Sequence, residues 1–233
     1  MITIENTSKS FEGKQVVNNL TLAVAEGEVY GLLGPNGAGK STTLNMLLGF
    51  LGPDSGKTFI AGFDAYNDSE RARQQIGYIP ENVNLYPHLT GLENLDYFCR
   101  LAKFHYSHKE LSSILTACGL QDSAHHQKTG SYSKGMHQKV GIATAYAKKA
   151  KIYLLDEPAS GLDPLASNEL SSLLKKLAEE GSAILMASHD IFRVRETCNK
   201  IGILKHGTLV KEMNASEVTA NELEKIYLNY MQD

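Results

Sequence analysis

The chain has 233 residues, of which 42% are hydrophobic and 21% charged, and its formal net charge is −3. This composition is typical of a globular protein and excludes disorder, collagen and coiled coil as the main state. At roughly 150 residues per domain, the length predicts one large domain or two small ones. The near-neutral charge gives no electrostatic reason to expect nucleic acid or an anionic membrane surface, so we predict that nucleic acid is not a partner.

The three cysteines, Cys99, Cys118 and Cys198, are far apart and form no CxxC pair, which predicts neither a disulfide framework nor a zinc site. They fit a reducing compartment. The N-terminus lacks the basic stretch and apolar run of a signal peptide, and no apolar run reaches the ~18 residues that span a bilayer. We therefore expect a chain that is soluble by itself and can still dock on a membrane partner.

The first residues predict an antiparallel β patch, because apolar side chains alternate with polar ones over residues 2–4 and 16–22. Four later runs are continuously apolar and bounded by polar residues, as parallel strands covered on both faces are. They lie at residues 28–33, 152–155, 183–187 and 201–204. Leucines at helical spacing predict helices over residues 40–50 and 166–180 between them. The alternation predicts an α/β core with a mostly parallel sheet.

The middle of the chain differs, because residues 82–149 contain no convincing strand. Capping boxes at Thr90–Glu93 and Ser107–Glu110 predict two helices there, and residues 134–149 predict a third. We therefore expect a core of residues 1–81 and 150–233 with an all-helical subdomain, 82–149, inserted in it. A last capping box at Thr219–Glu222 predicts a C-terminal helix in a stretch that carries no functional motif.

A phosphate-binding loop follows the first predicted buried strand and opens the next helix, because residues 34–42 match GxxxxGK[ST]. Glycines let backbone N–H groups turn toward phosphate oxygens, and the helix N-terminus adds a positive dipole end. Lys40 is suited to reach the β and γ phosphates, and Ser41 to ligate Mg²⁺. The predicted nucleotide-binding residues of this loop are Gly34, Pro35, Asn36, Gly37, Ala38, Gly39, Lys40, Ser41 and Thr42.

Two carboxylates, Asp156 and Glu157, end the apolar strand at residues 152–155. Acids at the carboxyl end of a parallel strand point into the crevice where ligands bind. We predict that Asp156 holds Mg²⁺ and that Glu157 accepts the proton of an attacking water. An apolar strand that ends in two acids is common by itself. It indicates a nucleotide site here because the chain also has a phosphate-binding loop.

Together these motifs resemble the nucleotide-binding subunit of an ATP-binding-cassette (ABC) transporter. The resemblance implies a P-loop NTPase of RecA-like core that binds ATP and Mg²⁺ and hydrolyses ATP. It also implies a head-to-tail homodimer that closes on ATP and drives transport through a separate membrane permease. The subunit would lie in the cytoplasm, peripheral on the inner face of the cell membrane through that permease.

Further motifs follow in the order of that family, from Phe11 to about residue 211. Residues 132–136 resemble the signature segment, in which Ser133 and Gly135 would contact the γ-phosphate bound to the opposite subunit. Asp163 resembles the residue that links the two sites across the dimer, and His189 the switch residue that contacts the γ-phosphate. We therefore predict Lys40, Glu157 and His189 as catalytic residues, and Ser133, Gly135 and Asp163 as nucleotide-site residues.

Phe11 lies where the family has the aromatic residue that stacks on adenine, although an aromatic residue in a β patch is more often a packing residue. Glu81 stands where the family usually has Gln. A carboxylate can still ligate Mg²⁺, so we predict Ser41, Glu81 and Asp156 as metal ligands. Lys134 and Met136 also depart from the signature pattern, and this variant resembles exporter-type cassettes. The other histidines lack metal-ligand spacing, and His125–His126 predicts a solvated loop.

Three alternatives can be weighed against this resemblance. A GTPase would need an NKxD segment, and Asn199-Lys200-Ile201-Gly202 lacks the Asp. A regulatory cassette without turnover is disfavoured by Lys40, Asp156, Glu157 and His189. The serious rival is a soluble ABC-type ATPase in a non-transport role, such as DNA maintenance or translation. The resemblance implies that the permease selects the transported substrate.

Overall fold

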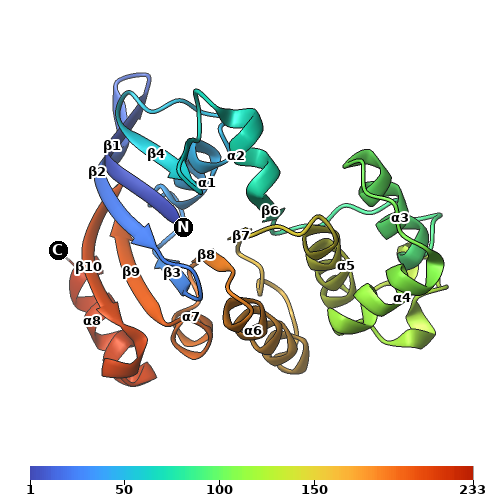
Figure 1. Ribbon diagram of the computed structural model, residues 1–233. Coiled ribbons are helices and arrows are strands. Elements are labelled where there is room, and N and C mark those ends of the chain that lie inside the picture. Colours follow the sequence, from blue (N-terminus) through green and yellow to red (C-terminus); the bar gives the residue numbers. More distant parts are fainter. Residues whose placement is uncertain (233) are drawn as a thin grey trace.

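The computed structural model describes residues 1–232 and contains two β-sheets with helices packed around them (Figure 1). The smaller sheet is antiparallel and has the strand order β2-β1-β4-β5. Its strands are β1 (Ile2–Phe11), β2 (Lys14–Val24), β4 (Ser55–Ile60) and β5 (Phe63–Asp64). Pairs such as Ile4 with Leu22 confirm the antiparallel patch that alternation predicts, whereas β4 and β5 were not predicted.

The larger sheet has the order β10-β9-β3-β8-β7-β6. The neighbouring pairs from β9 to β6 are all parallel, and only β10 runs antiparallel at the edge. The four predicted buried strands are confirmed, and the α/β fold class with them. The strands are β3 (Val29–Leu33), β6 (Ile76–Ile79), β7 (Ile152–Asp156), β8 (Ala183–Ser188), β9 (Lys200–Lys205) and β10 (Thr208–Asn214).

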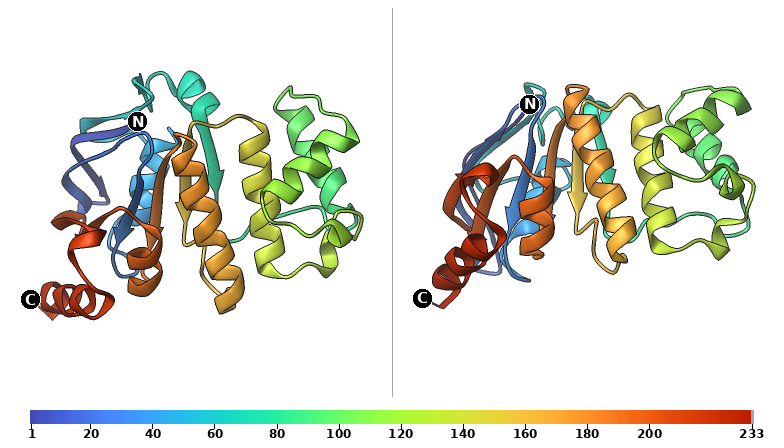
Figure 2. Two further views of the ribbon diagram at one scale, coloured as in Figure 1. Left: turned by 60° about the horizontal axis from the view of Figure 1, so that its bottom comes forward. Right: turned by 90° about the horizontal axis from the view of Figure 1, so that it is seen from below.

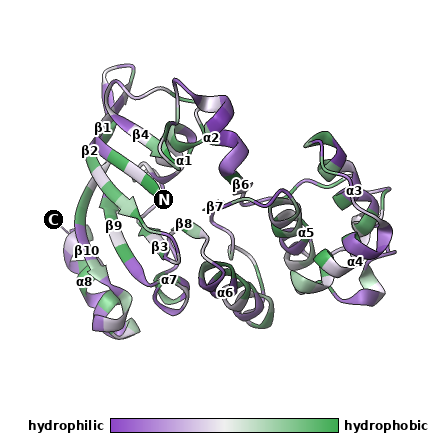
Figure 3. Ribbon diagram, viewed as in Figure 1, coloured by the Kyte–Doolittle hydropathy of each residue, from purple (hydrophilic) through white to green (hydrophobic). Residues whose placement is uncertain are grey.

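Successive side chains of a strand point to opposite faces of the sheet, and in the central strands β3 and β8 both sets are buried. Tyr30 and Leu32 of β3 pack into a core shared with the small sheet and α1 (Lys40–Leu47). Val29 and Leu33 pack into a second core with α5 (Lys134–Ala147), α6 (Pro164–Glu179) and α7 (Ile191–Thr197). Hydrophobic residues accordingly concentrate on the central strands, whereas α2 (Ser69–Gln75) is mostly hydrophilic (Figure 3).

Three helices and two 3₁₀ turns occupy the middle of the chain and lie to one side of the parallel sheet (Figure 2). They are α3 (Gly91–Leu101), α4 (His108–Ala117) and α5, with turns at Asp122–Ala124 and Thr129–Ser131. Thr90 and Ser107 form the predicted capping boxes of α3 and α4. We call α3, α4 and α5 with their connections the helical block. Its boundaries at residues 82 and 149 stay a prediction, and Asp233, the end of the predicted core, lies outside the described residues.

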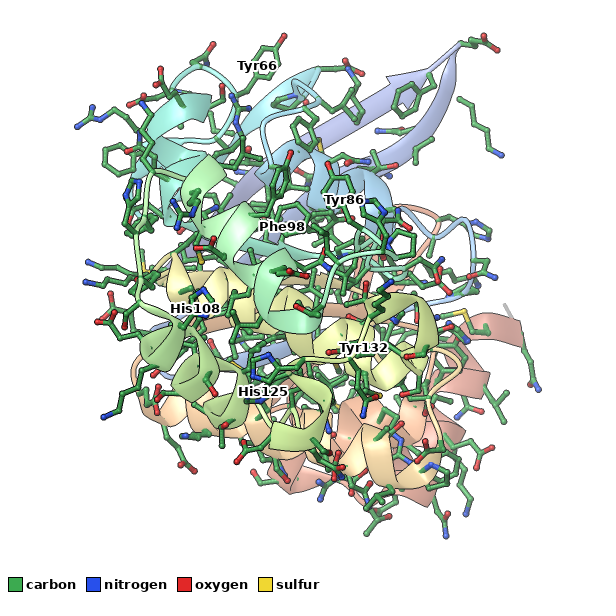
Figure 4. All side chains as sticks on the ribbon, turned by 90° about the vertical axis from the view of Figure 1, so that its right-hand side faces the viewer. Tyr66, Tyr86, Phe98, His108, His125 and Tyr132 are labelled. Atoms are coloured by element: carbon green, nitrogen blue, oxygen red, sulfur yellow. The ribbon has the colours of Figure 1, made fainter. Side chains whose placement is uncertain are left out.

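The helical block joins the sheet where α5 crosses β6, because Gly77 has no side chain and Ala145 packs directly on it. Figure 4 looks onto this block and labels two of its buried groups. The Tyr132 hydroxyl donates to the Ala124 carbonyl at 2.6 Å, and His125 Nδ1 lies 2.9 Å from Ser112 Oγ. His125 is only 1% exposed, so the predicted solvated loop is wrong for this residue, which packs inward to reach Ser112.

The described residues end in α8 (Ala220–Gln232), which follows a 3₁₀ turn at Ala215–Glu217 and confirms the predicted C-terminal helix. Thr219 and Glu222 exchange the hydrogen bonds of the predicted capping box. Across residues 1–232, no helix combines the length and the apolar character that crossing a membrane requires.

Candidate active site

A cavity of about 230 Å³ lies at the N-terminus of α1. It forms because β3 and β7 are parallel strands of one sheet, so the segments that follow them meet at the same edge. Glu81, the second residue after β6, completes the wall. The lining residues come from the predicted phosphate loop, the predicted acidic strand end and two further segments: Val16, Pro35, Asn36, Gly37, Gly39, Lys40, Ser41, Thr42, Glu81, Asp156 and Glu157.

Two glycines of the phosphate loop are required by close backbone contacts. Gly39 has φ +105°, and a Cβ there would lie 2.6 Å from the carbonyl oxygen of Val16. At Gly34, a Cβ would lie 2.5 Å from the carbonyl oxygen of Leu204. Gly39 is also the residue before the first turn of α1, so the loop can pass directly into the helix. The sequence motif is therefore matched by a backbone that tolerates no side chain at these positions.

Lys40 is buried, with 6% of its surface exposed, and its ammonium group bonds to its own loop. Its Nζ donates to the carbonyl oxygens of Gly34 at 2.6 Å and Pro35 at 3.2 Å. It also lies 3.3 Å from Glu157 Oε1. An ammonium group that is held by neutral carbonyls and one carboxylate is placed to exchange them for phosphate oxygens.

Glu157 and His189 lie side by side, although 32 residues separate them in the sequence. Residues 156 and 187 pair in the parallel β7–β8 ladder, which brings the two strand ends together. Glu157 Oε2 lies 2.9 Å from His189 Nδ1, and it accepts longer bonds of 3.3 Å from Ser188 Oγ and from the His189 backbone N–H. The predicted base and the predicted switch histidine are thus in direct contact.

The second carboxylate oxygen of Glu157 has no hydrogen-bond donor. Oε1 is buried and accepts no hydrogen bond, and its 3.3 Å approach to Lys40 is an ion pair without hydrogen-bond geometry. Glu157 also has φ +46°, a left-handed conformation that is uncommon outside glycine. Local strain of this kind concentrates at functional sites. Glu157 is therefore a carboxylate with spare accepting capacity, held by its backbone at the cavity wall.

Asp156 lies beside Ser41 at the same wall. Burial raises the pKa of the Asp156 carboxyl group, and a hydrogen bond with the Ser41 side chain partly offsets this. Among residues 1–232, no three carboxylate, imidazole or thiol side chains gather as a metal site. The oxygens of Ser41, Asp156 and Glu81 that line the cavity are nevertheless the hard ligands that suit Mg²⁺, with phosphate oxygens and water able to complete its coordination.

The remaining predicted residues do not line this cavity. Phe11 is 45% exposed at the end of β1. Ser133 and Asp163 are exposed N-caps, accepting from the backbone N–H groups of Met136 at 3.3 Å and of Ala166 at 2.9 Å. Ser133, Gly135 and Asp163 instead line a separate cavity of about 220 Å³ between α5 and α6. Within one chain, the structure does not join them to Lys40.

Several contacts at the site were not predicted from the sequence. Ser188 binds Glu157, and Val16 lines the phosphate cavity. The contact of Ser188 could have been predicted, because Ser188 directly precedes His189 at the end of an apolar strand. Val16 is brought in from β2 by the fold alone and carries no signal in the sequence.

Comparison with known proteins gives a consistent result. The family model described as "ABC transporter" matches residues 17–160. The chain is 38% identical over 215 residues to the "Uncharacterized ABC transporter ATP-binding protein YdbJ" of Bacillus subtilis, covering 92% of this chain and 69% of that protein. It is 36% identical over 213 residues to "Nod factor export ATP-binding protein I" of Burkholderia lata, covering 91% and 70%.

A solved structure is also similar over nearly its whole length. It is the dimeric structure of a post-hydrolysis state of the ATP-binding cassette MJ0796 bound to ADP and Pi. The TM-score is 0.80 at 30% sequence identity, with 92% of this chain and 99% of that chain covered. The fold similarity thus extends beyond the motif segments.

Proposed function

This chain belongs to the ABC transporter family, and from that membership we propose that it powers export through a separate membrane permease, as one half of an ATP-bound homodimer. As an ABC ATP-binding subunit the chain binds and hydrolyses ATP.

The contact between Glu157 and His189 beside Lys40 carries the residue assignments. We assign Lys40 and the phosphate loop, residues 34–42, to binding the phosphates. Glu157 has a buried oxygen without a hydrogen bond, so it can accept a proton from a water molecule at the cavity wall. The His189 imidazole contacts the other oxygen of Glu157 and is half exposed beside the cavity lining. It is therefore assigned to orient that water and contact the γ-phosphate.

Mg²⁺ fits this cavity through Ser41, Asp156 and Glu81, since all three offer oxygen ligands on one wall. The ion would supply positive charge to the β and γ phosphate oxygens. The raised pKa of Asp156 supports this assignment, because a buried carboxylate without a full cationic partner is stabilised by a cation.

The homodimer is supported by the place of Ser133, Gly135 and Asp163. These residues lie together at a cavity away from Lys40, where a γ-phosphate bound to a second copy can meet them. The N-terminus of α5 favours an anion at that point. The similar cassette MJ0796 is dimeric in the post-hydrolysis state. Phe11 is proposed to stack on adenine, because its ring is exposed at the end of β1.

The permease and the direction of transport are inferred from relatives. The Burkholderia protein is an export ATP-binding protein by name, and no helix of the described residues is suited to crossing a membrane. The chain is then held at the inner face of the cell membrane by its permease, without nucleic acid as a partner. The helical block, residues 82–149, is proposed as the unit that passes motion to the permease.

Affinity purification of the tagged chain from detergent-solubilised membranes tests the transport role. We expect an integral membrane protein to co-purify with the chain and to stimulate its ATPase activity when both are reconstituted. The non-transport alternative predicts an ATPase that is recovered from the soluble fraction without such a protein, and this result would overturn the assignment to a transporter.

A further inference from the structure

Glu81, at the wall of the phosphate cavity, is held by two other segments of the chain. Its Oε1 accepts a hydrogen bond from Ser160 Oγ at 2.9 Å. The same oxygen lies 3.8 Å from the ammonium group of Lys134 in the first turn of α5. The buried Gln138, one turn further along α5, donates its side-chain N–H to the Glu81 carbonyl oxygen at 2.9 Å. Both the backbone and the carboxylate of Glu81 are therefore bound to the start of α5.

The Lys134 side chain lies between Glu81 and the turn at residues 160–161, and it is partly buried there. Its side chain is 30% exposed. A Cβ built on Gly161 would lie 3.7 Å from both Cδ and Nζ of Lys134, so the lysine covers the turn that carries Ser160. Lys134 and Glu81 are also the positions where this sequence carries charges instead of the Gly and Gln of the common family pattern. The two departures face each other and have opposite charge.

Glu81 adds a negative charge to the lining of the phosphate cavity. Glu81, Asp156 and Glu157 all line this cavity. A triphosphate entering this cavity would therefore meet three carboxylates, and only Lys40 among the lining side chains is a cation. A cation that screens Glu81 lowers this repulsion.

We propose that Lys134 is a positioning residue that neutralises Glu81 and, with Ser160, fixes it at the wall of the phosphate cavity. This rests on the proposed function, because it presumes that the cavity binds ATP phosphates. Lys134 then acts on the nucleotide of its own chain through Glu81.

Calorimetric titration with ATP in the presence of EDTA, at low ionic strength, tests the pair. Lys134→Gln should weaken ATP binding by roughly two- to five-fold, the range expected for an exposed ion pair, and Lys134→Arg should restore it. In a Glu81→Gln background, Lys134→Gln should have no effect, because no charge remains to neutralise. The effect should shrink at high salt.

Lys176→Gln is the matched control, because Lys176 forms an exposed ion pair of similar length with Glu180, at 4.0 Å, and lines neither the phosphate cavity nor the cavity at Ser133. It should bind ATP like the wild type. A loss for Lys134→Gln that is equal in both backgrounds would show that the lysine contacts the nucleotide directly and would overturn the proposal, as would no loss in either. Failure of the wild-type chain to bind ATP would instead contradict the site assigned above. Circular dichroism identifies any variant that has not folded.

Discussion

The phosphate cavity and the first turn of α5 hold their polar groups in opposite ways. In the cavity, Lys40 and Glu157 are mostly buried and pair with each other, although they come from different segments. At α5, Ser133 is exposed, and its hydroxyl caps its own helix. On the proposed assignments, the cavity binds phosphates with one chain alone, whereas Ser133 and Asp163 need a second chain to reach a nucleotide. Each of the following predictions tests one side of this difference.

The largest expected effect concerns Lys40. Lys40→Ala removes the cation of the cavity and leaves the buried Glu157 Oε1 without its ion pair, so ATP binding should fall below detection. Hydrolysis should fall by at least roughly 100-fold. Titration calorimetry and phosphate release measure both quantities. Lys57→Ala, an exposed lysine of β4, is the control, and normal ATP affinity of the Lys40→Ala variant would contradict the assignment.

Replacing Glu157 should separate binding from turnover. Glu157→Gln keeps the shape of the side chain but removes the proton acceptor, so hydrolysis should fall roughly 10²- to 10⁴-fold. ATP binding should persist, since the phosphate loop is intact. Glu179→Gln, near the end of α6, should hydrolyse ATP normally. Wild-type turnover of the Glu157→Gln variant would require a different base.

Ser133 should matter for assembly and little for binding of ATP to one chain. Ser133→Ala removes the N-cap of α5 and should lower the free energy of unfolding by about 1 kcal/mol. It should also weaken the ATP-dependent dimer, seen by analytical ultracentrifugation in the Glu157→Gln background. Ser107→Ala removes the equivalent cap of α4 and should cost similar stability without affecting the dimer. Equal dimer loss in both would make the effect one of folding alone.

The smallest expected effect is the pH dependence contributed by Asp156. Because burial raises its pKa above the ordinary carboxyl value of 3.8, the folded state binds the proton more tightly than the unfolded state does. Its contribution to stability is complete below that value and is lost as pH rises through the raised pKa. Asp156→Asn should therefore raise the melting temperature at neutral pH, and the gain should vanish in acid. A gain independent of pH would contradict this cause.

The sequence predicted the buried parallel strands and the capped helices, and it missed β4 and β10 as well as the shortest elements. Continuous apolar runs identified β3, β7, β8 and β9, and three capping boxes located α3, α4 and α8. β6 and β5, with four and two residues, are too short to show a period. In α2 only Ala72 is buried, so its sequence has no apolar face. These elements form because neighbouring strands and helices pack on them.

At the site, the sequence identified the residue types but not all of their partners. Lys40, Asp156 and Glu157 were readable from local motifs, and the structure places them at one cavity. The contact of Glu81 with Lys134 joins residues 53 positions apart and depends on how α5 packs against β6, which no local pattern encodes. The capping role of Asp163 was likewise not predicted, because the family motif indicates only a role across the dimer.

Subunit complementation tests most directly the claim that the phosphate cavity of one chain works with the Ser133 face of another. Glu157→Gln has an inactive cavity and an intact face, and Ser133→Arg has an intact cavity and a blocked face. Each variant alone should be nearly inactive. An equimolar mixture should hydrolyse ATP well above the mean of the two, because the mixed dimer contains one intact composite site. A mixture that shows only that mean would contradict the account.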